Sequence, residues 1–329
     1  MHFILWFVSC LVLLKVVNAL TCFWCKSKVC LVGKTAIITG GAAGIGFQTA
    51  LALASKGCRV IIADISNLTK AVDELKNVSK NQNIIGVEVD LASFRSVREF
   101  AKKILDTEPR LDILVCNAGI GEHKMRIMTG DGVEKTMQIN YYSHFLMIHL
   151  LLDLLKKSAP SRIAITSSVL AYVSDLTVKE LNPSPDYFEE RKGWRTFNCG
   201  TYSASKLCLA GLTKTLASKL QGTEVIVNVC HPNGVRTSIY APVVRQAIGL
   251  SYFVSSLYCL VCLFGKTPEE GAQTLIHLAH SEEVKLINGR SFYEGMVVHP
   301  PFQLTDYFCE QLWKASIEYT KLTPEEIKC

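Results

Sequence analysis

Tyr202 and Lys206 stand four positions apart in a stretch, Tyr-Ser-Ala-Ser-Lys, that we expect to be helical. On a helix, side chains with this spacing lie on one face. A tyrosine is a poor base because its reference pKa is about 10, and lowering that pKa by about 3 units requires roughly 4 kcal/mol of preference for the phenolate. A neighbouring ammonium group and a positively charged nicotinamide ring would supply this preference. The pair therefore indicates proton exchange with an alcohol oxygen.

Two polar residues upstream could assist the same chemistry. Ser168 follows an apolar run and could donate a hydrogen bond to a substrate oxygen, and Asn140 could hold a water molecule for a proton relay. Taken singly, these residues have ordinary explanations: a core tyrosine, a surface lysine, a turn serine and a capping asparagine. The occurrence of all four in one chain favours a catalytic interpretation.

A glycine-rich stretch predicts the cofactor site. Thr39–Gly46 reads Thr-Gly-Gly-Ala-Ala-Gly-Ile-Gly, and it lies between an expected strand at Thr35–Ile38 and an expected helix at Phe47–Ala54. Glycines allow the backbone to approach a phosphate closely, and the first turn of a helix offers N–H groups and the positive end of its dipole. We expect the pyrophosphate of a dinucleotide at this turn.

Asp64 indicates which dinucleotide binds. It ends the second expected strand, about 20 residues beyond the glycine turn, where a carboxylate can accept hydrogen bonds from ribose hydroxyls and repel a 2′-phosphate. Ile65 follows it and provides no positive charge for such a phosphate. We therefore predict NAD as the preferred cofactor, and leave NADP open.

The segments that must position these residues alternate between apolar runs and helical stretches. Apolar strands of this kind predict a parallel sheet that helices cover on both faces. We expect one domain with an α/β, doubly wound parallel sheet, in which ligands bind beyond the carboxyl ends of the strands. The expected strands are Thr35–Ile38, Val60–Ala63, Ile84–Val89, Leu111–Cys116, Arg162–Thr166 and Val225–Cys230.

Composition excludes some classes of function. Lys plus Arg number 35 and Asp plus Glu number 29, giving a net charge of +6 that is scattered, so we predict no nucleic-acid partner. The 13 cysteines include one CxxC pair, Cys22 and Cys25, without a second pair or histidine cluster at zinc spacing, so we predict no metal. Their spread favours a reducing compartment. A mean hydropathy of +0.24 points to membrane contact.

The apolar run Phe3–Trp24 has three alternative explanations: a membrane anchor, a cleaved signal peptide or a buried core helix. Its length approaches the ~20 residues that span a bilayer, and no positive region precedes it, as a signal peptide would require. We predict an anchor within residues 1–30 and a catalytic domain over residues 31–329. Positive charge after the run places that domain on the cytosolic side by the positive-inside rule. These residues are Lys26, Lys28 and Lys34.

Two further segments have open interpretations. Val169–Thr201 is a long polar insertion between Ser168 and Tyr202, and it predicts either a surface loop or a wall of the substrate pocket. Ile248–Phe264 is uncharged and rich in aromatic residues. It predicts either a core helix or a helix that lies on a membrane surface.

From about Val32 onward the chain resembles the short-chain dehydrogenase/reductase family. The resemblance is carried by Thr39-Gly40-x-x-x-Gly44-x-Gly46, Asn117-Ala118-Gly119, Asn140, Ser168 and Tyr202-x-x-x-Lys206. It implies a Rossmann fold and a catalytic tetrad of Asn140, Ser168, Tyr202 and Lys206. It also implies that Asp90 lies near the adenine and Thr237 near the carboxamide. The implied cofactor-binding residues are Thr39, Gly40, Gly44, Ile45, Gly46, Asp64, Asp90, Leu91, Asn117, Ala118, Gly119, Tyr202, Lys206 and Thr237.

Within the family, the chain is similar to the branch of retinol dehydrogenases and polyprenol dehydrogenases. Lys266–Gln273, the long insertion and the apolar N-terminus carry this likeness. Two departures are Ile65, where retinol dehydrogenases usually have arginine, and Asn233, which interrupts the usual His-Pro-Gly.

The branch implies a membrane-attached enzyme that interconverts a hydrophobic, isoprenoid- or retinoid-like alcohol and its carbonyl. It further implies the endoplasmic reticulum membrane with a cytosolic catalytic domain, and leaves a lipid-droplet surface and a homodimer open. The alternative substrates are a steroid or another lipid alcohol. The alternative from another class is a cofactor-binding protein without turnover.

Overall fold

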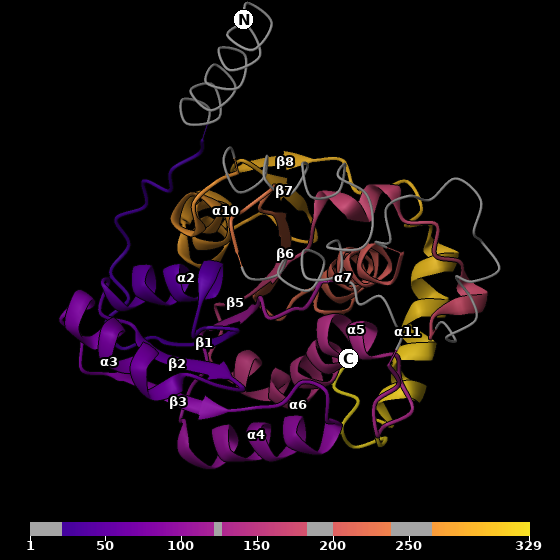
Figure 1. Cartoon of the computed structure of the whole chain (residues 1–329), viewed down its shortest axis with the longest axis horizontal. Coiled ribbons are helices and arrows are strands. Elements are labelled where there is room, and N and C mark those ends of the chain that lie inside the picture. The colour runs from indigo at the N-terminus through magenta and orange to yellow at the C-terminus, as the bar shows by residue number, and fades with distance from the viewer. Residues whose placement is uncertain (1–21, 122–126, 183–199, 238–264) are drawn as a thin grey trace, which may run out of the picture.

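A single eight-stranded sheet forms the centre of the protein, in the order β3-β2-β1-β4-β5-β6-β7-β8 (Figure 1). The structure, a computed structural model, describes residues 22–121, 127–182, 200–237 and 265–329. Strands β1 to β7 run parallel, and β8 pairs antiparallel with β7. The strands are β1 Thr35–Thr39, β2 Arg59–Asp64, β3 Ile84–Glu88, β4 Ile113–Cys116, β5 Ser161–Thr166, β6 Val225–His231, β7 Ser291–Tyr293 and β8 Met296–Val298.

Successive side chains of the central strands enter two different hydrophobic cores. Ile37 and Ile61 pack in one core and Ile38 and Ile62 in the other, and all four are fully buried. This alternation follows from the pleat of a strand, which turns neighbouring side chains to opposite faces. Both faces of the sheet are therefore covered, which confirms the predicted doubly wound α/β fold.

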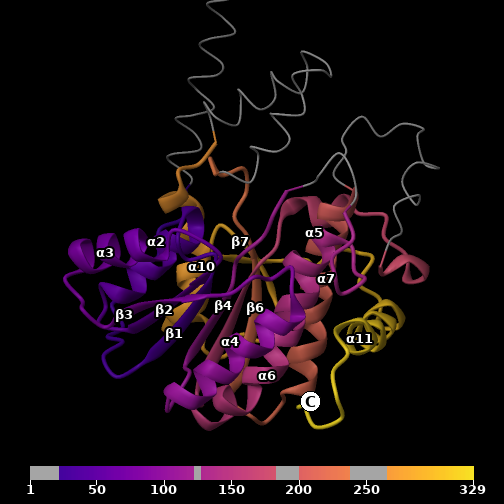
Figure 2. The same ribbon diagram turned by 60° about the horizontal axis from the view of Figure 1, so that its bottom comes forward.

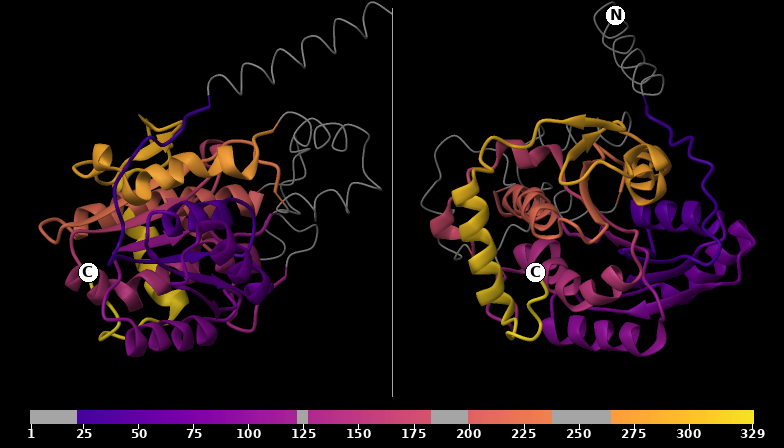
Figure 3. Two further views of the ribbon diagram at one scale, coloured as in Figure 1. Left: turned by 90° about the vertical axis from the view of Figure 1, so that its left-hand side faces the viewer. Right: turned by 180° about the vertical axis from the view of Figure 1, so that it is seen from behind.

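Helices α2, α3 and α10 cover one face, and α4, α6 and α7 cover the other (Figure 2). Helix α11 packs outside α7 and α6, as Figure 3 shows from behind. The helices are α2 Gly44–Ala54, α3 Leu68–Ser79, α4 Phe94–Thr107, α5 Lys135–Met137, α6 Ser143–Lys157, α7 Gly200–Lys219, α10 Pro268–His280 and α11 Asp306–Thr320. Shorter turns are η1 Gln138–Tyr142, η2 Val169–Val173, η3 Val178–Glu180 and η6 Glu282–Val284.

Asp112 fixes the start of β1 against β4. Its carboxylate accepts hydrogen bonds from Thr35 N and Lys34 Nζ, each at 2.9 Å, and from Arg110. Burial raises the pKa of Asp112, but these hydrogen bonds outweigh burial and hold the pKa below its ordinary value of 3.8. Strand β4 begins at Ile113, two residues later than the predicted start at Leu111.

The other predicted strands are confirmed with small shifts at their ends. Two differences are larger. The first helix begins at Gly44 instead of Phe47, so the last glycines of the motif are helical. Strands β7 and β8 were not predicted, because a strand of three residues is too short to show a periodic pattern.

The structure describes only part of the segments whose sequence allowed more than one interpretation. Within Val169–Thr201, the structure shows η2, η3 and the first residues of α7, and Ala171 and Leu181 are buried in the core. Residues 183–199 and the segment Ile248–Phe264, for which a core helix and a membrane-surface helix were both expected, lie outside the described residues, as does nearly all of Phe3–Trp24. Among the helices that are described, none has the length and apolar character needed to cross a bilayer.

Candidate active site

The predicted site residues gather at the carboxyl edge of the sheet, where most of them follow the ends of β1, β4, β5 and β6. Parallel strands end at the same edge, so the polar residues that follow each of them are brought together. The glycine turn follows β1, Asn117 follows β4, Ser168 follows β5, and Pro232 to Thr237 follow β6.

The glycine turn allows α2 to approach β1 very closely. A methyl group on Gly46 would lie 2.1 Å from Gly40 O and 2.7 Å from Asn117 Nδ2, and one on Gly40 would lie 2.9 Å from Ala118 Cα. Gly44 opens α2 with φ +58°, a conformation that favours glycine. No side chain caps the N-terminus of α2, and its first turn contains no acidic residue. This cradle fits the pyrophosphate of a dinucleotide.

The Thr39 hydroxyl joins the glycine turn to the loop after β4. Its oxygen accepts hydrogen bonds from Asn117 N at 2.9 Å and Ala118 N at 3.0 Å. The amide of Asn117 donates in return to Thr39 O at 3.1 Å. Thr39 is fully buried, so these bonds form away from solvent and fix the two turns relative to each other.

His144 connects Thr39 to the Asn140 backbone. Its Nε2 lies 2.9 Å from Thr39 Oγ1 and its Nδ1 lies 3.0 Å from Asn140 O. The Asn140 carbonyl can only accept, so Nδ1 carries the ring proton and donates it, which leaves Nε2 as an acceptor for the Thr39 hydroxyl. The same hydroxyl also lies 3.2 Å from Val115 O, a second acceptor for its proton. Burial lowers the pKa of His144 to about 4, so the ring is neutral at physiological pH. Sequence reasoning missed His144, although its position four residues after Asn140 places both on one helical face.

Asn140 lies in a π-helical turn, η1, directly before α6. Its side chain accepts from Ile120 N at 2.8 Å, and donates to Ile120 O and Ser205 Oγ, both at 3.0 Å. Single π turns occur frequently at functional sites because they redirect a side chain out of the regular helix. Here the turn connects Asn140 to α7, one residue before Lys206.

Tyr202 and Lys206 occupy one face of α7, as predicted. The Lys206 ammonium lies 5.5 Å from the centre of the Tyr202 ring and donates to Thr166 O at 3.0 Å. Lys206 is 2% exposed, and this burial lowers its pKa to about 8. Because that pKa remains above neutrality, Lys206 carries a positive charge beside the half-buried tyrosine at physiological pH.

Ser168 and His231 lie on the other side of the site. Ser168 lies two residues after the end of β5 and caps η2, and its hydroxyl oxygen accepts a hydrogen bond from Leu170 N at 3.2 Å. His231, at the end of β6, lies beside the Ser168 backbone and edge-on to Tyr172. Its ring is 1% exposed, and neither ring nitrogen has a partner in hydrogen-bonding geometry among the described residues. Sequence reasoning assigned no role to His231, yet an orphaned buried imidazole at this edge suits a polar ligand.

The remaining predicted residues lie around the glycine turn. Asp64 accepts hydrogen bonds from Ala42 N at 3.1 Å and from Ile65 N at 2.8 Å, so its carboxylate faces the turn. Thr237 lies so close to Gly44 that a methyl group on the glycine would be 3.4 Å from Thr237 Cγ2. Leu91 O accepts from Ser143 Oγ at 2.6 Å, which connects the Asp90–Leu91 turn to the start of α6.

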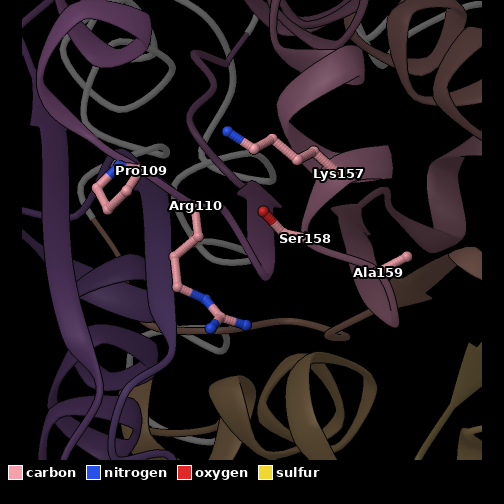
Figure 4. Close-up of a pocket in the computed structure, with 5 residues that line it drawn as sticks. All are labelled: Pro109, Arg110, Lys157, Ser158 and Ala159. Atoms are coloured by element: carbon pink, nitrogen blue, oxygen red, sulfur yellow. The ribbon is translucent and has the colours of Figure 1, made fainter.

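A hollow at the opposite edge of the sheet is separate from this site. It is lined by residues that precede β4 and β5 (Figure 4). Since ligands of parallel sheets bind beyond the carboxyl ends of the strands, this hollow does not belong to the predicted site. Its lining residues are Pro109, Arg110, Lys157, Ser158 and Ala159.

The sheet order, the uncapped glycine turn and the buried Lys206 together define a dinucleotide-binding dehydrogenase fold. Comparison with known families agrees, because the short chain dehydrogenase family matches residues 34–178 and 193–247. The chain belongs to this family, whose members act on CH–OH groups with NAD or NADP.

Individual relatives fall within one branch of the family. The chain is 41% identical to human retinol dehydrogenase 14 over 79% of its own length and 78% of the relative's. It is 36% identical to human retinol dehydrogenase 12 over 89% of its length and 88% of the relative's. These matches confirm the predicted likeness to retinol dehydrogenases.

Two solved structures share the fold. Levodione reductase superposes with a TM-score of 0.63 at 18% identity, covering 79% of this chain and 95% of that one. The NADP complex of RhlG from Pseudomonas aeruginosa gives a TM-score of 0.59 at 27% identity, covering 80% of this chain and 95% of RhlG.

Replacing Gly46 with alanine tests the cradle. The added methyl group would meet Gly40 O, which is backbone and cannot move aside cheaply, so α2 must shift. We expect dinucleotide affinity to fall at least about tenfold, which corresponds to the loss of about 1.4 kcal/mol of binding free energy. Titration of protein fluorescence with NADH and NADPH measures it. The control is Gly130→Ala, where a methyl group meets nothing within 4 Å. Unchanged affinity in Gly46→Ala would contradict the assignment of the cradle.

Proposed function

We propose that this protein is a dehydrogenase that interconverts a hydrophobic alcohol and its carbonyl, with Asn140, Ser168, Tyr202 and Lys206 as its catalytic residues. The observation that carries the proposal is the buried Lys206 ammonium 5.5 Å from the centre of the Tyr202 ring. Burying an ammonium group costs free energy, because burial disfavours the ionised form. Its position beside the predicted base supports a role in lowering the proton affinity of the phenol.

In this mechanism Tyr202 exchanges the proton of the substrate hydroxyl. Lys206 remains charged below its pKa of about 8 and stabilises the phenolate by electrostatic attraction. Ser168 donates a hydrogen bond to the substrate oxygen, and Asn140 holds a water molecule that passes the proton onward. A nicotinamide cofactor held at this site would supply the hydride transfer to or from the carbinol carbon.

The glycine turn with Thr39 and the loop Asn117–Gly119 would hold the dinucleotide. Asp90 and Leu91 would contact its adenine, Tyr202 and Lys206 its nicotinamide ribose, and Thr237 its carboxamide. NAD is the proposed preference because the Asp64 carboxylate is already oriented by Ala42 N and Ile65 N toward the turn. A 2′-phosphate there would meet negative charge without a compensating cation from Ile65.

The names of the relatives support a hydrophobic substrate of the retinoid or isoprenoid type. Within this class we propose retinoid and polyprenoid alcohols before steroids. The chain's apolar N-terminus supports attachment to the endoplasmic reticulum membrane with the catalytic domain in the cytosol. Assays of retinol, a polyprenol and a steroid alcohol with each cofactor test the proposal, and binding of NAD without turnover of any alcohol would contradict it.

Tyr202→Phe removes the proposed proton-transferring group. We expect kcat for alcohol oxidation to fall by about 10²–10⁴-fold, the usual contribution of a general acid or base. NAD affinity should stay within about twofold of the wild-type value, because the ring and Lys206 remain. Steady-state kinetics and cofactor titration measure the two quantities. The matched control is Tyr307→Phe, which removes a hydroxyl from a tyrosine that is 63% exposed on α11. Near-normal turnover in Tyr202→Phe would exclude the mechanism.

Ile65→Arg tests the cofactor preference while leaving the hydrogen bonds of Asp64 in place. A guanidinium group beside the ribose should attract a 2′-phosphate, so kcat/KM for NADP relative to NAD should rise about tenfold or more. Val78→Arg adds the same charge at a position that is equally exposed, 57% in both cases. It should leave the ratio unchanged. A wild-type enzyme that already prefers NADP would contradict the role given to Asp64.

The sequence contains two N-glycosylation sequons, Asn67-Leu68-Thr69 and Asn77-Val78-Ser79. Their modification in cells reports which side of the membrane the domain occupies. Both asparagines are exposed, so folding does not shield them from the lumenal transferase. A cytosolic domain predicts that neither is glycosylated in cells. The measurement is electrophoretic mobility before and after glycosidase treatment. A shift would place the domain in the lumen, and a mature N-terminus near residue 20 would indicate a cleaved signal peptide instead of an anchor.

A further inference from the structure

The turn between β7 and β8 contains a residue that is unfavourable there. It consists of Glu294 and Gly295, with φ of +48° and +72°, so both residues lie in the left-handed region. Two-residue hairpins of this type prefer Asn, Asp or Gly at the first position, because other side chains are strained. A strained non-glycine residue persists where surrounding interactions hold it, and it often marks a function.

The Glu294 carboxylate joins two distant parts of the chain. One oxygen accepts a hydrogen bond from Phe23 N at 3.0 Å, and the other forms an ion pair with Lys266. The side chains of Glu294 and Lys266 are only 15% and 9% exposed. We call this arrangement of Phe23, Glu294 and Lys266 the clasp.

The Phe23 side chain secures the same connection. Gly295 leaves room for it, since a methyl group on Gly295 would lie 2.5 Å from the ring. On its other side the ring lies edge-on to His277 of α10, with 5.1 Å between ring centres. Next along the chain, Cys25 N donates to Gln273 Oε1 at 3.1 Å. The residues that follow the apolar N-terminus are thus fastened to α10 and the hairpin.

Both ends of the clasp adjoin apolar runs of the sequence. Phe23 lies at the end of the run Phe3–Trp24, and Lys266 follows the uncharged run Ile248–Phe264 after one glycine. The chain next to each of these runs therefore contacts the same carboxylate, that of Glu294, although the runs are more than 200 residues apart in sequence.

The clasp lies at the same edge of the sheet as the active site. β7 runs parallel to β6, and Tyr293 is paired with His231, so the turn that follows β7 is at the carboxyl edge. Lys266 also donates its backbone N–H to Gly234 O, and its carbonyl accepts from Arg236 N, each at 2.9 Å. The adjoining Thr237 contacts Gly44 of the cofactor cradle. Beside the clasp, Met296 is 66% exposed.

We propose that the clasp orients the domain so that a lipid bilayer docks on the carboxyl edge of the sheet, around the β7–β8 turn, with the active site facing the lipid. A hydrophobic alcohol dissolved in the bilayer would then reach Tyr202 without crossing water. The part of this proposal that concerns substrate rests on the proposed function, and the docking surface itself does not.

Glu294→Asn breaks the clasp while improving the turn, because asparagine favours the left-handed conformation. The matched control is Glu224→Asn, since Glu224 has a similar φ of +56° but lies just before β6, at the opposite edge of the sheet. The unfolding temperature of Glu224→Asn should match the wild type, whereas that of Glu294→Asn should fall, because Lys266 is left largely buried without its partner. The measurements below are therefore made at a temperature at which both variants are folded. Flotation with phosphatidylcholine vesicles should also be retained in both, because each keeps the two apolar runs.

Amide hydrogen exchange of the full chain tests the docking surface. In wild type and Glu224→Asn, phosphatidylcholine vesicles should slow exchange of residues 22–30 and 291–298 relative to the detergent-solubilised chain. In Glu294→Asn this difference between vesicles and detergent should disappear. Equal exchange with and without vesicles in the wild type would overturn the proposal, and so would protection that rises with protein concentration in detergent, which would identify a second copy as the occupant.

The ratio of turnover on a vesicle-dissolved alcohol to turnover on a water-soluble alcohol provides a second measurement. A loosened hairpin alone would not change this ratio. For Glu294→Asn, kcat/KM for retinol dissolved in vesicles should fall about fivefold or more, whereas kcat/KM for water-soluble prenol should not change. Equal losses for both alcohols would overturn the orienting role. If the wild type oxidises neither alcohol, the proposed function fails, and the exchange measurement still decides whether the bilayer docks at the clasp.

Discussion

The hydroxyl of Thr39 is the interaction on which the arrangement of the site depends. It binds the amides after β4 and, through His144, the backbone of Asn140. One buried oxygen therefore connects the cofactor turn, the Asn117–Gly119 loop and the π turn before α6. These buried hydrogen bonds hold the three segments together and keep Asn140 in place beside α7.

The central part of the fold could be predicted from sequence because its signals are strong and local. Apolar runs such as Val60–Ala63 show a buried parallel strand without any knowledge of neighbours, and the spacing of Tyr202 and Lys206 alone shows a shared helical face. These predictions depend on patterns that each segment carries within itself.

What sequence could not supply are properties that arise only between segments. The tautomer of His144 follows from the Asn140 carbonyl that faces its Nδ1, and no pattern along the chain contains the orientation of that ring. The hairpin of β7 and β8 is too short to be periodic, and Glu294 at its turn contradicts the usual residue preference. Such a local conflict becomes intelligible once Phe23 and Lys266 are seen on the two oxygens of one carboxylate.

Strand β8 has a consequence for the behaviour of the purified protein in water. It is the last strand of the sheet, and an edge strand presents backbone groups that can pair with another chain. The edge is blunted by its brevity, three residues, but Met296 and Val297 on it are 66% and 48% exposed. Stripped of lipid or detergent, the molecule would combine apolar side chains with an open ladder of hydrogen bonds, a surface that invites edge-to-edge aggregation.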